Sequence, residues 1–262
     1  MMRVLQWNMQ ITERNASTIA SARLELLSEA LQQLQPDFVF LQEADSRARR
    51  MLDVGYECAE GPKRIVTLWR KGQYVSQGSW EATQRAQLTL LDPSFLLLNV
   101  HLPVLHCSKP KQRSAGGHIR EELILARGQH AGRREVHGGD YNMPPHDELL
   151  VMDSGFYANR CLEYALKSGI DISKKRLFNC SWKVYGGDCG ALGTYYSGDC
   201  EDGPWNVPDQ IFLDPQIVGN GIVEVRVITT VAEHSLMKRT GTPGGRGSDH
   251  FPLFVSVGDA TS

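Results

Sequence analysis

The sequence contains no hydrophobic run approaching the ~18 residues that a membrane-spanning helix needs. Its N-terminus has no basic segment followed by a long apolar one, as a secretory signal has. The six cysteines form no Cys-x-x-Cys pair, which argues against a zinc site, and most are expected to be reduced thiols. In an exported protein, the candidates for a disulfide would be Cys180, Cys189 and Cys200. These absences favour an intracellular protein over a secreted one and predict no contact with a membrane.

The charge is nearly balanced, with 28 basic and 30 acidic residues and a net charge of −2, so it favours no class of partner. Basic residues do cluster locally, for example at residues 109–113 and 174–176. Such clusters are equally consistent with a solvated surface and with a rim that binds phosphate groups. The 262 residues have the composition of a globular protein, without internal repeats or a linker. A single domain over residues 1–262 is predicted, and nothing predicts a protein partner.

Short apolar runs bounded by turn residues predict strands along most of the chain. The predicted strands are residues 3–8, 38–41, 65–69, 74–80, 95–101, 136–139, 211–213, 222–231 and 251–257. Helical spacing predicts helices at residues 19–34, 119–130 and 160–167, while residues 106–118 are expected to form an exposed loop. The strand–helix–strand order at the start is typical of an α/β protein and, by itself, would predict a parallel sheet.

Polar side chains stand where these strands begin or end. They are Asn8, Glu43, Asn99, His101, Asp140, Asn142, Asp209, Asp249 and His250. Because strand ends meet along one edge of a sheet, residues from six separate segments can line one cleft. Carboxylate and amide oxygens suit Mg²⁺ or Mn²⁺, while imidazoles and amides can donate hydrogen bonds to phosphate oxygens. This combination is typical of a site in which water attacks a phosphoester.

Each of these residues also has an ordinary structural interpretation. Asn8 and Asn142 are common turn residues, Glu43 can be an exposed acid, and His101 can be a structural histidine. At any one position the structural interpretation is at least as frequent as the functional one. It would have to hold at all nine positions at once, so the functional interpretation is favoured for the group.

Six segments, in this order, resemble the six motifs of the endonuclease/exonuclease/phosphatase superfamily: Trp7-Asn8, Leu41-Gln42-Glu43, Asn99-Val100-His101, Gly139-Asp140-Tyr141-Asn142, Asp209-Gln210-Ile211-Phe212 and Ser248-Asp249-His250. The resemblance runs from residue 4 to residue 255. It implies a four-layer α/β/β/α sandwich in which helices flank two mostly antiparallel sheets, and so replaces the parallel sheet that the local order predicts.

The same resemblance implies three groups of site residues. The ligands of a Mg²⁺ (or Mn²⁺) ion would be Glu43, Asp249 and Asn8. The scissile phosphate would be bound by Asn142 and His101. Asp140 would orient or deprotonate the attacking water, and His250, paired with Asp209, would stabilise the transition state or serve as the general base. Either Asp140 or His250 would take the proton.

The third motif narrows the choice within the family. Abasic-site endonucleases usually carry Tyr-x-Pro-Asn there, whereas Asn99-Val100-His101 is closer to the deoxyribonuclease, deadenylase, tyrosyl-DNA phosphodiesterase and phosphatase branches. The first choice is a Mg²⁺-dependent nuclease or nucleic-acid phosphodiesterase acting on DNA or RNA. Its substrate contacts would include Asn99, Lys109, Lys111 and Arg113. Aromatic residues that would stack bases, or merely anchor loops, are Trp182, Tyr185, Tyr195, Tyr196 and Trp205.

Two other functions stay open. The runner-up is a phosphatase or phosphodiesterase acting on a small-molecule or lipid phosphoester, whose head group the same loops would bind. A non-catalytic binding module on this fold is disfavoured because no residue of the group is missing.

Overall fold

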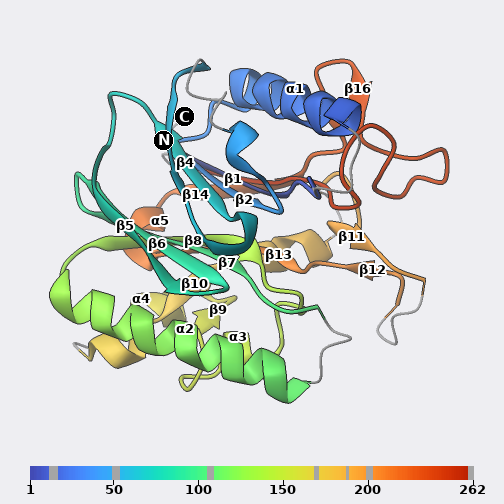
Figure 1. Cartoon of the computed structure of the whole chain (residues 1–262). Helices are drawn as coiled ribbons and strands as arrows, with labels where there is room; N and C mark the ends of the chain where they lie inside the picture. Colours follow the sequence, from blue (N-terminus) through green and yellow to red (C-terminus); the bar gives the residue numbers. More distant parts are fainter. Residues whose placement is uncertain are drawn as a thin grey trace.

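The computed structural model describes residues 1–11, 17–48, 54–104, 109–167, 171–186, 189–198 and 203–258. Two sheets lie face to face, and helices cover their outer faces (Figure 1). The first sheet has the strand order β14 (Ile222–Val227), β17 (Leu253–Gly258), β1 (Met2–Asn8), β2 (Phe38–Gln42), β4 (Val66–Arg70) and β3 (Tyr56–Glu60). The second has the order β5 (Val75–Thr83), β6 (Ala86–Asp92), β7 (Phe95–His101), β8 (Arg134–Asp140), β13 (Asp209–Leu213), β10 (Leu177–Asn179) and β9 (Ala158–Asn159).

The remaining elements connect these strands. Two short hairpins are β11 (Tyr195–Tyr196) with β12 (Trp205–Asn206), and β15 (Thr230–Val231) with β16 (His234–Ser235). The α-helices are α1 (Ser17–Leu34), α2 (Lys109–Gln129), α3 (Glu148–Val151), α4 (Leu162–Leu166) and α5 (Pro215–Val218). Two single turns of 3₁₀-helix are η2 (Pro62–Arg64) and η3 (Ile172–Lys174), and a longer 3₁₀-helix is η4 (Cys180–Gly186).

Most neighbouring strands pair antiparallel. Among the strands that the structure describes, β1–β2, β7–β8 and β9–β10 pair parallel. In the chain, α1 lies between β1 and β2, and α2 lies between β7 and β8. The strand–helix–strand order therefore does give parallel strand pairs, but only at these two places. The predicted sandwich of two mostly antiparallel sheets flanked by helices is confirmed.

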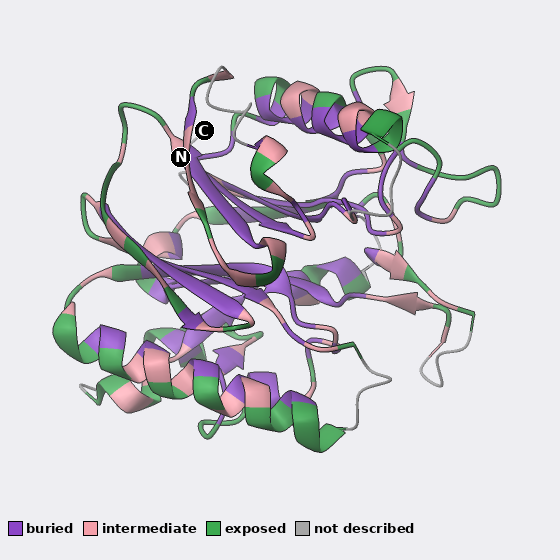
Figure 2. Ribbon diagram, in the orientation of Figure 1, coloured by how far each residue is buried: buried purple, intermediate pink, exposed green. Residues whose placement is uncertain are grey.

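The two faces of the second sheet belong to different cores, because successive side chains of a strand point to opposite faces. Leu97 and Ile211 belong to the core that includes α1 and the first sheet, whereas Leu98 and Phe212 pack with residues of α2. Figure 2 shows the buried strands in the middle and helices whose buried side faces them. The sheets approach closely at Gly138, where an added Cβ would lie 2.2 Å from the ring of Phe40. Only glycine fits this position, two residues before Asp140.

The helix α2 begins well before the predicted residue 119, so the expectation of an exposed loop is wrong from residue 109 onward. Gln112 is buried, and its side-chain amide donates to the carbonyl of Pro103 at 2.8 Å. Gly116 lies against Leu149 of α3, where an added Cβ would be 2.4 Å from that side chain. Its lower helix propensity is therefore outweighed by close helix–helix packing, a tertiary effect that local patterns do not report.

The strands β3 and β6 were not predicted. In β6, the buried side chains include Gln87 and Thr89, which interrupt the apolar run although both lie away from water. Among the cysteines considered for a disulfide, Cys180 is a buried free thiol, and burial raises its pKa well above the usual range. Cys200 lies outside the described residues. Within the described chain, no helix is both long and apolar enough to cross a membrane.

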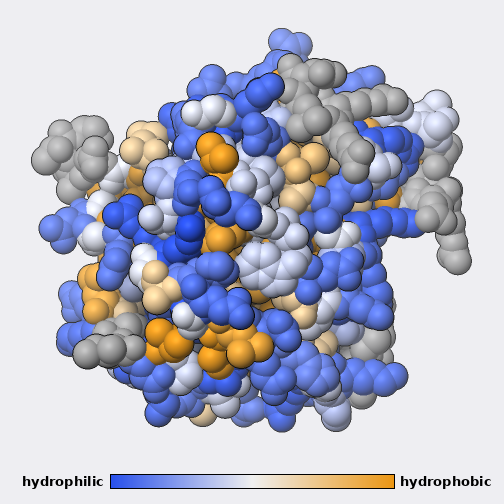
Figure 3. All heavy atoms as spheres, turned by 60° about the vertical axis from the view of Figure 1, so that its left-hand side comes forward, coloured by the Kyte–Doolittle hydropathy of each residue, from blue (hydrophilic) through white to orange (hydrophobic). Residues whose placement is uncertain are grey.

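The surface on the left-hand side of Figure 1 is mixed in character. Figure 3 shows hydrophobic side chains there as small, separate groups among hydrophilic ones on the described part of that face. Scattered groups of this kind are ordinary for a folded domain and point to no binding surface.

A buried cluster of charges lies where β8 begins. The carboxylate of Glu135 accepts hydrogen bonds from Arg127 (2.8 and 2.9 Å) and pairs with Lys175 at 3.0 Å, while Nε2 of His137 lies 3.1 Å away. Lys175 also pairs with Asp214 at 2.6 Å. Burial alone would raise the pKa of Glu135, but the charge of Arg127, the hydrogen bond to His137 and the charge of Lys175 hold that pKa well below its ordinary value of 4.5.

Replacing Glu135 by Gln is expected to lower the free energy of unfolding by about 3–5 kcal/mol at neutral pH, because the buried guanidinium of Arg127 loses its carboxylate, while Lys175 keeps its pair with Asp214. The folded-state pKa of Glu135 is depressed, so its contribution is complete above pH 4.5 and is lost as the pH falls through the lower folded value. Urea unfolding of wild type and variant should give a stability difference that shrinks below pH 4.5.

The exposed Glu121→Gln on α2 is the matched control and should unfold like the wild type at every pH. A Glu135→Gln variant as stable as the wild type at neutral pH would contradict the assignment.

Candidate active site

Strand register brings side chains from both sheets to one end of the sandwich. In the second sheet, Asp140 at the end of β8 pairs across with His101 at the end of β7 and with Asp209 at the start of β13. In the first sheet, Asn8 ends β1, and Glu43 directly follows β2. These five residues come from separate parts of the chain and meet where the two sheets face each other.

Asp140 lies at the centre of this group. Its Oδ2 accepts a hydrogen bond from Nδ2 of Asn8 at 3.0 Å and lies 3.9 Å from Nε2 of His101 and 4.0 Å from Nε2 of His250. Its Oδ1 accepts from the backbone N–H of Asn142 at 2.9 Å, which fixes the turn after β8. One oxygen of Asp140 therefore faces two imidazoles, and the other holds the loop.

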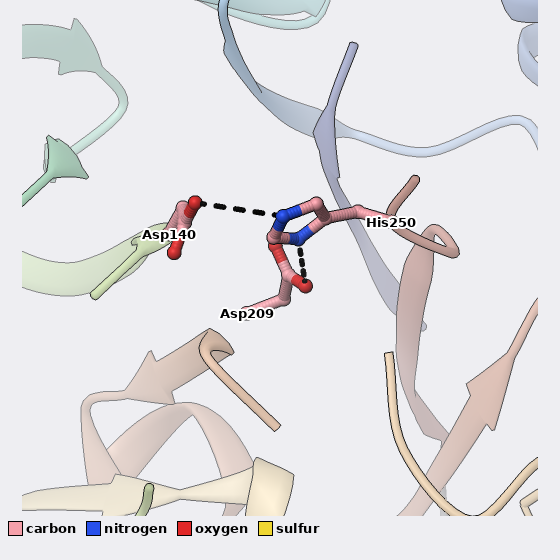
Figure 4. A group of neighbouring side chains, drawn as sticks. All are labelled: Asp140, Asp209 and His250. Atoms are coloured by element: carbon pink, nitrogen blue, oxygen red, sulfur yellow. Dashed lines mark hydrogen bonds and ion pairs between the residues drawn. The ribbon is translucent and has the colours of Figure 1, made fainter. Parts of the chain in front are cut away.

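His250 and Asp209 form a buried pair. Nδ1 of His250 lies 2.8 Å from Oδ2 of Asp209, and Nε2 points toward Asp140 (Figure 4). Burial alone would lower the pKa of His250, but the charge of Asp209 and its hydrogen bond outweigh burial and raise that pKa to about 10. The pair therefore presents Nε2 of His250 toward Asp140 in a fixed orientation.

The hairpin of β11 and β12 packs beside this pair. Tyr195 forms an isolated bridge with His250, and their ring centroids are 4.7 Å apart. The N–H of Phe251 donates to the carbonyl of Thr194 at 2.7 Å. Of the aromatic residues considered for base stacking, Tyr195 thus lies at the site, and the hairpin is fastened to the segment that carries His250.

The residues predicted to hold a metal include Glu43, which has an unusual backbone conformation with φ of 49°. Its Oε1 lies 3.8 Å from Nε2 of His101 and 3.4 Å from Nδ2 of Asn8. Asn8 therefore offers its amide N–H groups to two carboxylates, Glu43 and Asp140, while its Oδ1 accepts from the N–H of Gln10 at 3.1 Å. In this orientation Asn8 holds the carboxylates together as a donor, and a role as an oxygen ligand remains a prediction.

Asp249, the other predicted ligand, is held by the segment after β1. Its Oδ2 accepts from Nε2 of Gln10 at 2.9 Å, and its Oδ1 accepts from the hydroxyl of Ser248 at 3.2 Å. Oε1 of Gln10 accepts in turn from Nη2 of Arg23 at 3.1 Å. Burial lowers the pKa of Arg23, whereas the charges of Asp249 and Glu43 act in the opposite direction. Arg23 is therefore linked to Asp249 through the side chain of Gln10.

The chemistry of the donors fits a divalent cation. Carboxylate oxygens outnumber the cationic groups that the described residues place around them, and oxygen donors are what Mg²⁺ and Mn²⁺ prefer. A second possible ligand group consists of Asp140, Asp209 and His250, whose potential ligand atoms all lie within 4.8 Å of one another. In that group, however, both oxygens of Asp209 already accept hydrogen bonds, from Gln6 and His250. The ligand set of Glu43, Asp249 and Asn8 stays a prediction.

Asn142 and His101, predicted to bind phosphate, lie at the same end of the sheet. Nδ2 of Asn142 donates to the carbonyl of Leu102 at 2.9 Å, which leaves its Oδ1 and one N–H for other partners. Nδ1 of His101 is buried and accepts or donates no hydrogen bond among the described residues. Its Nε2 faces Glu43 and Asp140.

The prediction that Asn99 contacts substrate is corrected by its position. Asn99 is 0% exposed, and its amide bonds to Gln42 (2.7 Å), Thr67 (3.2 Å) and the carbonyl of Val66 (3.0 Å). Its side chain points between the sheets. It lies on the same face of β7 as His101, two residues further from the end of the strand. Asn99 is therefore an interior residue behind the site.

The predicted basic contacts lie on the first turns of α2. Lys109, Lys111 and Arg113 are exposed, and Arg113 forms a surface ion pair with Glu148 at 2.6 Å. The start of α2 is linked to the site because Nε2 of Gln112 donates to the carbonyl of Asn142 at 3.2 Å. The structure thus places these charges beside the loop that follows Asp140, and their role in binding stays a prediction.

Sequence reasoning missed the polar residues that support the site from within, above all Gln6, Gln10 and Arg23. For Gln6 the signal was present, because it lies two residues before Asn8 on the same face of β1, whereas Gln10 lies beyond the strand with φ of 49°. Alternation of polar and apolar residues commonly marks a strand with one solvated face. In the structure that face lies against a second sheet, and Gln6 is 0% exposed.

No family model matches the chain, and no curated protein matches it. Three of the solved structures that match it do so over nearly their whole lengths. An endonuclease/exonuclease/phosphatase family protein from Bacteroides thetaiotaomicron matches with a TM-score of 0.66 and 17% identity, over 98% of this chain and 97% of the other. A mannosyl-6-phosphatase from the same organism matches with a TM-score of 0.65 and 17% identity, over 98% of this chain and 100% of the other. An AP endonuclease from Archaeoglobus fulgidus matches with a TM-score of 0.60 and 13% identity, over 98% of this chain and 99% of the other.

At these identities the likeness defines the fold. The chain has the fold of the endonuclease/exonuclease/phosphatase superfamily, and the resemblance seen in the six sequence motifs is confirmed at that level. The solved structures include both nucleases and a phosphatase, so the fold alone does not choose a substrate.

Proposed function

We propose that the protein is a divalent-metal-dependent phosphoesterase that hydrolyses phosphodiester bonds of a nucleic acid. The observation that carries this proposal is the position of Asp140, whose one oxygen lies within 4.0 Å of Asn8, His101 and His250. Carboxylate, amide and imidazole groups from both sheets thus surround one point. Such a point suits a phosphoryl group because donors stabilise its oxygens while a carboxylate orients water.

The residues of the site divide the chemical work. Asp140 orients the attacking water and accepts its proton. His250, whose pKa is raised to about 10, is protonated at neutral pH and stabilises the transition state through Nε2, which lies 4.0 Å from Oδ2 of Asp140. Asp209 holds the imidazole of His250 through Nδ1. Asn142 and His101 donate to the oxygens of the phosphoryl group as its negative charge grows.

Glu43 and Asp249, with Asn8 beside them, would hold the cation, Mg²⁺ or Mn²⁺. When bound, the cation supplies a Lewis acid that polarises a phosphoryl oxygen and offsets its charge. The positive φ of Glu43 is in keeping with a functional position, because strained backbone is tolerated mostly at such sites.

Nucleic acid is the first choice of substrate because exposed Lys109 and Lys111 lie beside the loop after Asp140, and Tyr195 lies at His250. Basic side chains bind phosphate backbone, and an aromatic ring can stack a base. The second candidate is a phosphatase or phosphodiesterase for a small phosphoester. It is favoured by the likeness of the fold to a mannosyl-6-phosphatase.

Loss of either carboxylate ligand should weaken metal binding. Mn²⁺ affinity, measured by calorimetry or electron paramagnetic resonance on metal-free protein, is expected to fall about tenfold or more in Glu43→Gln and in Asp249→Asn, since ligand charge sets affinity. The exposed acid Glu224 on β14 provides the control, Glu224→Gln, which should bind like the wild type. Equal affinity in all three variants would refute the ligand assignment.

Hydrolysis itself is tested with Mg²⁺ and a panel of substrates: single- and double-stranded DNA, RNA, an abasic duplex, bis(p-nitrophenyl) phosphate and sugar phosphates. On any substrate that is cleaved, Asp140→Asn and His250→Gln are expected to lower kcat by about 100-fold or more, as loss of general acid–base groups does. The exposed His118→Gln on α2 should keep full activity. Full activity in the two site variants would overturn the proposed roles.

Substrate class is tested by salt. If the substrate is a nucleic acid, log K for binding should fall linearly with log salt, and the double variant Lys109→Ala/Lys111→Ala should lower that slope by roughly one to two units. The control is the exposed Lys71→Ala, at the opposite end of the first sheet. An unchanged slope together with efficient cleavage of sugar phosphates would favour the small-phosphoester alternative.

A further inference from the structure

A layer of amide side chains lies between the two sheets, directly behind the site. Its three members are Gln6 on β1, Gln42 on β2 and Asn99 on β7, and each is 0% exposed. Nε2 of Gln6 donates to Oε1 of Gln42 at 2.7 Å, and Nε2 of Gln42 donates to Oδ1 of Asn99 at 2.7 Å. The same Nε2 of Gln6 donates to Oδ1 of Asp209 at 2.8 Å. The layer therefore ends on the carboxylate that holds His250.

The direction of these hydrogen bonds is fixed from both ends. At one end, an ionised Asp209 can only accept, so the amide nitrogen of Gln6 must face it. At the other end, Nδ2 of Asn99 lies 3.0 Å from the carbonyl oxygen of Val66, which also only accepts. Both requirements give the same orientation to Gln42 between them. Each of the three amides therefore has a single orientation: Gln6 donates to Asp209 and Gln42, Gln42 donates to Asn99, and Asn99 donates to the carbonyl of Val66.

The orientation of Gln6 serves Asp209 at a cost to Gln6 itself. Among the described residues, Oε1 of Gln6 is buried and accepts no hydrogen bond. Turning the amide over would satisfy nothing, because Oε1 would then face the oxygens of Asp209 and Gln42. A buried carbonyl without a partner is unfavourable, and such exceptions are uncommon enough to need an explanation.

We propose that Gln6 is a positioning residue for hydrolysis, which holds Asp209 so that His250 presents Nε2 to the reacting phosphoryl group. This inference rests on the proposed function, in which His250 takes part in the reaction. Oδ1 of Asp209 is held by Gln6, and Oδ2 by Nδ1 of His250 at 2.8 Å. Two hydrogen bonds on the two oxygens fix the plane of the carboxylate and, through it, the direction of the imidazole. Gln6 is 0% exposed, so it acts without touching substrate.

A purely structural role would be to join the two sheets, and the chain offers a matched control for it. Gln87 on β6 is 1% exposed and lies in the same inter-sheet region, where its Oε1 accepts from the hydroxyl of Thr67 at 2.8 Å. Thr67 connects to Asn99 at 3.2 Å. Gln87 thus shares residue type, burial and network with Gln6, but it has no hydrogen bond to Asp209.

The experiment compares Gln6→Met, Gln42→Met and Gln87→Met. Gln6→Met is expected to lower kcat by about tenfold or more while KM changes by less than about threefold, as loss of a supporting partner does. Gln42→Met keeps the contact of Gln6 with Asp209 but loses the acceptor that orients it, so its kcat should fall less. Gln87→Met should keep kcat within about threefold of the wild type at a similar loss of thermal stability.

A spectroscopic signature, which needs no substrate, separates this inference from the proposed function. The proton shared by His250 and Asp209 should give a downfield ¹H resonance that is assigned through loss in His250→Gln. It should shift in Gln6→Met and stay unchanged in Gln87→Met. If no phosphoester is cleaved, the proposed function fails, while the resonance still tests the link from Gln6 to His250.

Two results would overturn the inference: an unmoved resonance in Gln6→Met, or a loss of kcat in Gln87→Met as large as in Gln6→Met. If Gln6→Met does not fold, the inference is tested by comparing kcat of Gln42→Met with kcat of Gln87→Met. Equal kcat values in these two variants would contradict the inference.

Discussion

The hydrogen bond between His250 and Asp209 is the interaction on which the rest of the site depends. Asp209 begins β13 of the second sheet, and His250 precedes β17 of the first, so this 2.8 Å contact joins the two sheets at one end. Around it, buried amides and carboxylates stand where apolar side chains such as Phe40, Leu97 and Ile211 pack further along between the sheets. Buried polar groups are tolerated only with partners, and here the partners are the site and its supports.

Along the strands, the residues that stabilise the fold lie in one part and the residues of the candidate site lie at one end. The inner face of β13 shows this, because it passes from the apolar Leu213 and Ile211 to Asp209 at the end where the site lies. At the other end of β8, the charges around Glu135 pair with one another and, among the described residues, with none of the site. The apolar part holds the sheets at a fixed distance, and that rigidity positions the side chains of the candidate site at the polar end.

Much of the site could be predicted from sequence because its residues stand where apolar runs stop, as Glu43 does after β2 and Asp140 does at the end of β8. Residues in the middle of such runs were harder. Gln6 and Asn99 lie on alternating positions that resemble a solvated or substrate-facing side, yet a second sheet covers both. The start of α2 was missed for a related reason, since Gly116 is favourable there only because Leu149 packs against it. Long-range packing decided each of these cases, and local pattern carries no record of it.

The central claim is that separate carboxylates, amides and imidazoles surround one divalent cation and one phosphoryl group. Anomalous diffraction from crystals soaked with Mn²⁺ and inorganic phosphate tests it most directly. The account predicts a Mn²⁺ peak at oxygen-ligand distances of roughly 2.0–2.4 Å from Glu43 and Asp249, with phosphate between it and His250. A Mn²⁺ ion bound away from Glu43, with phosphate absent from the vicinity of Asp140 and His250, would contradict the account.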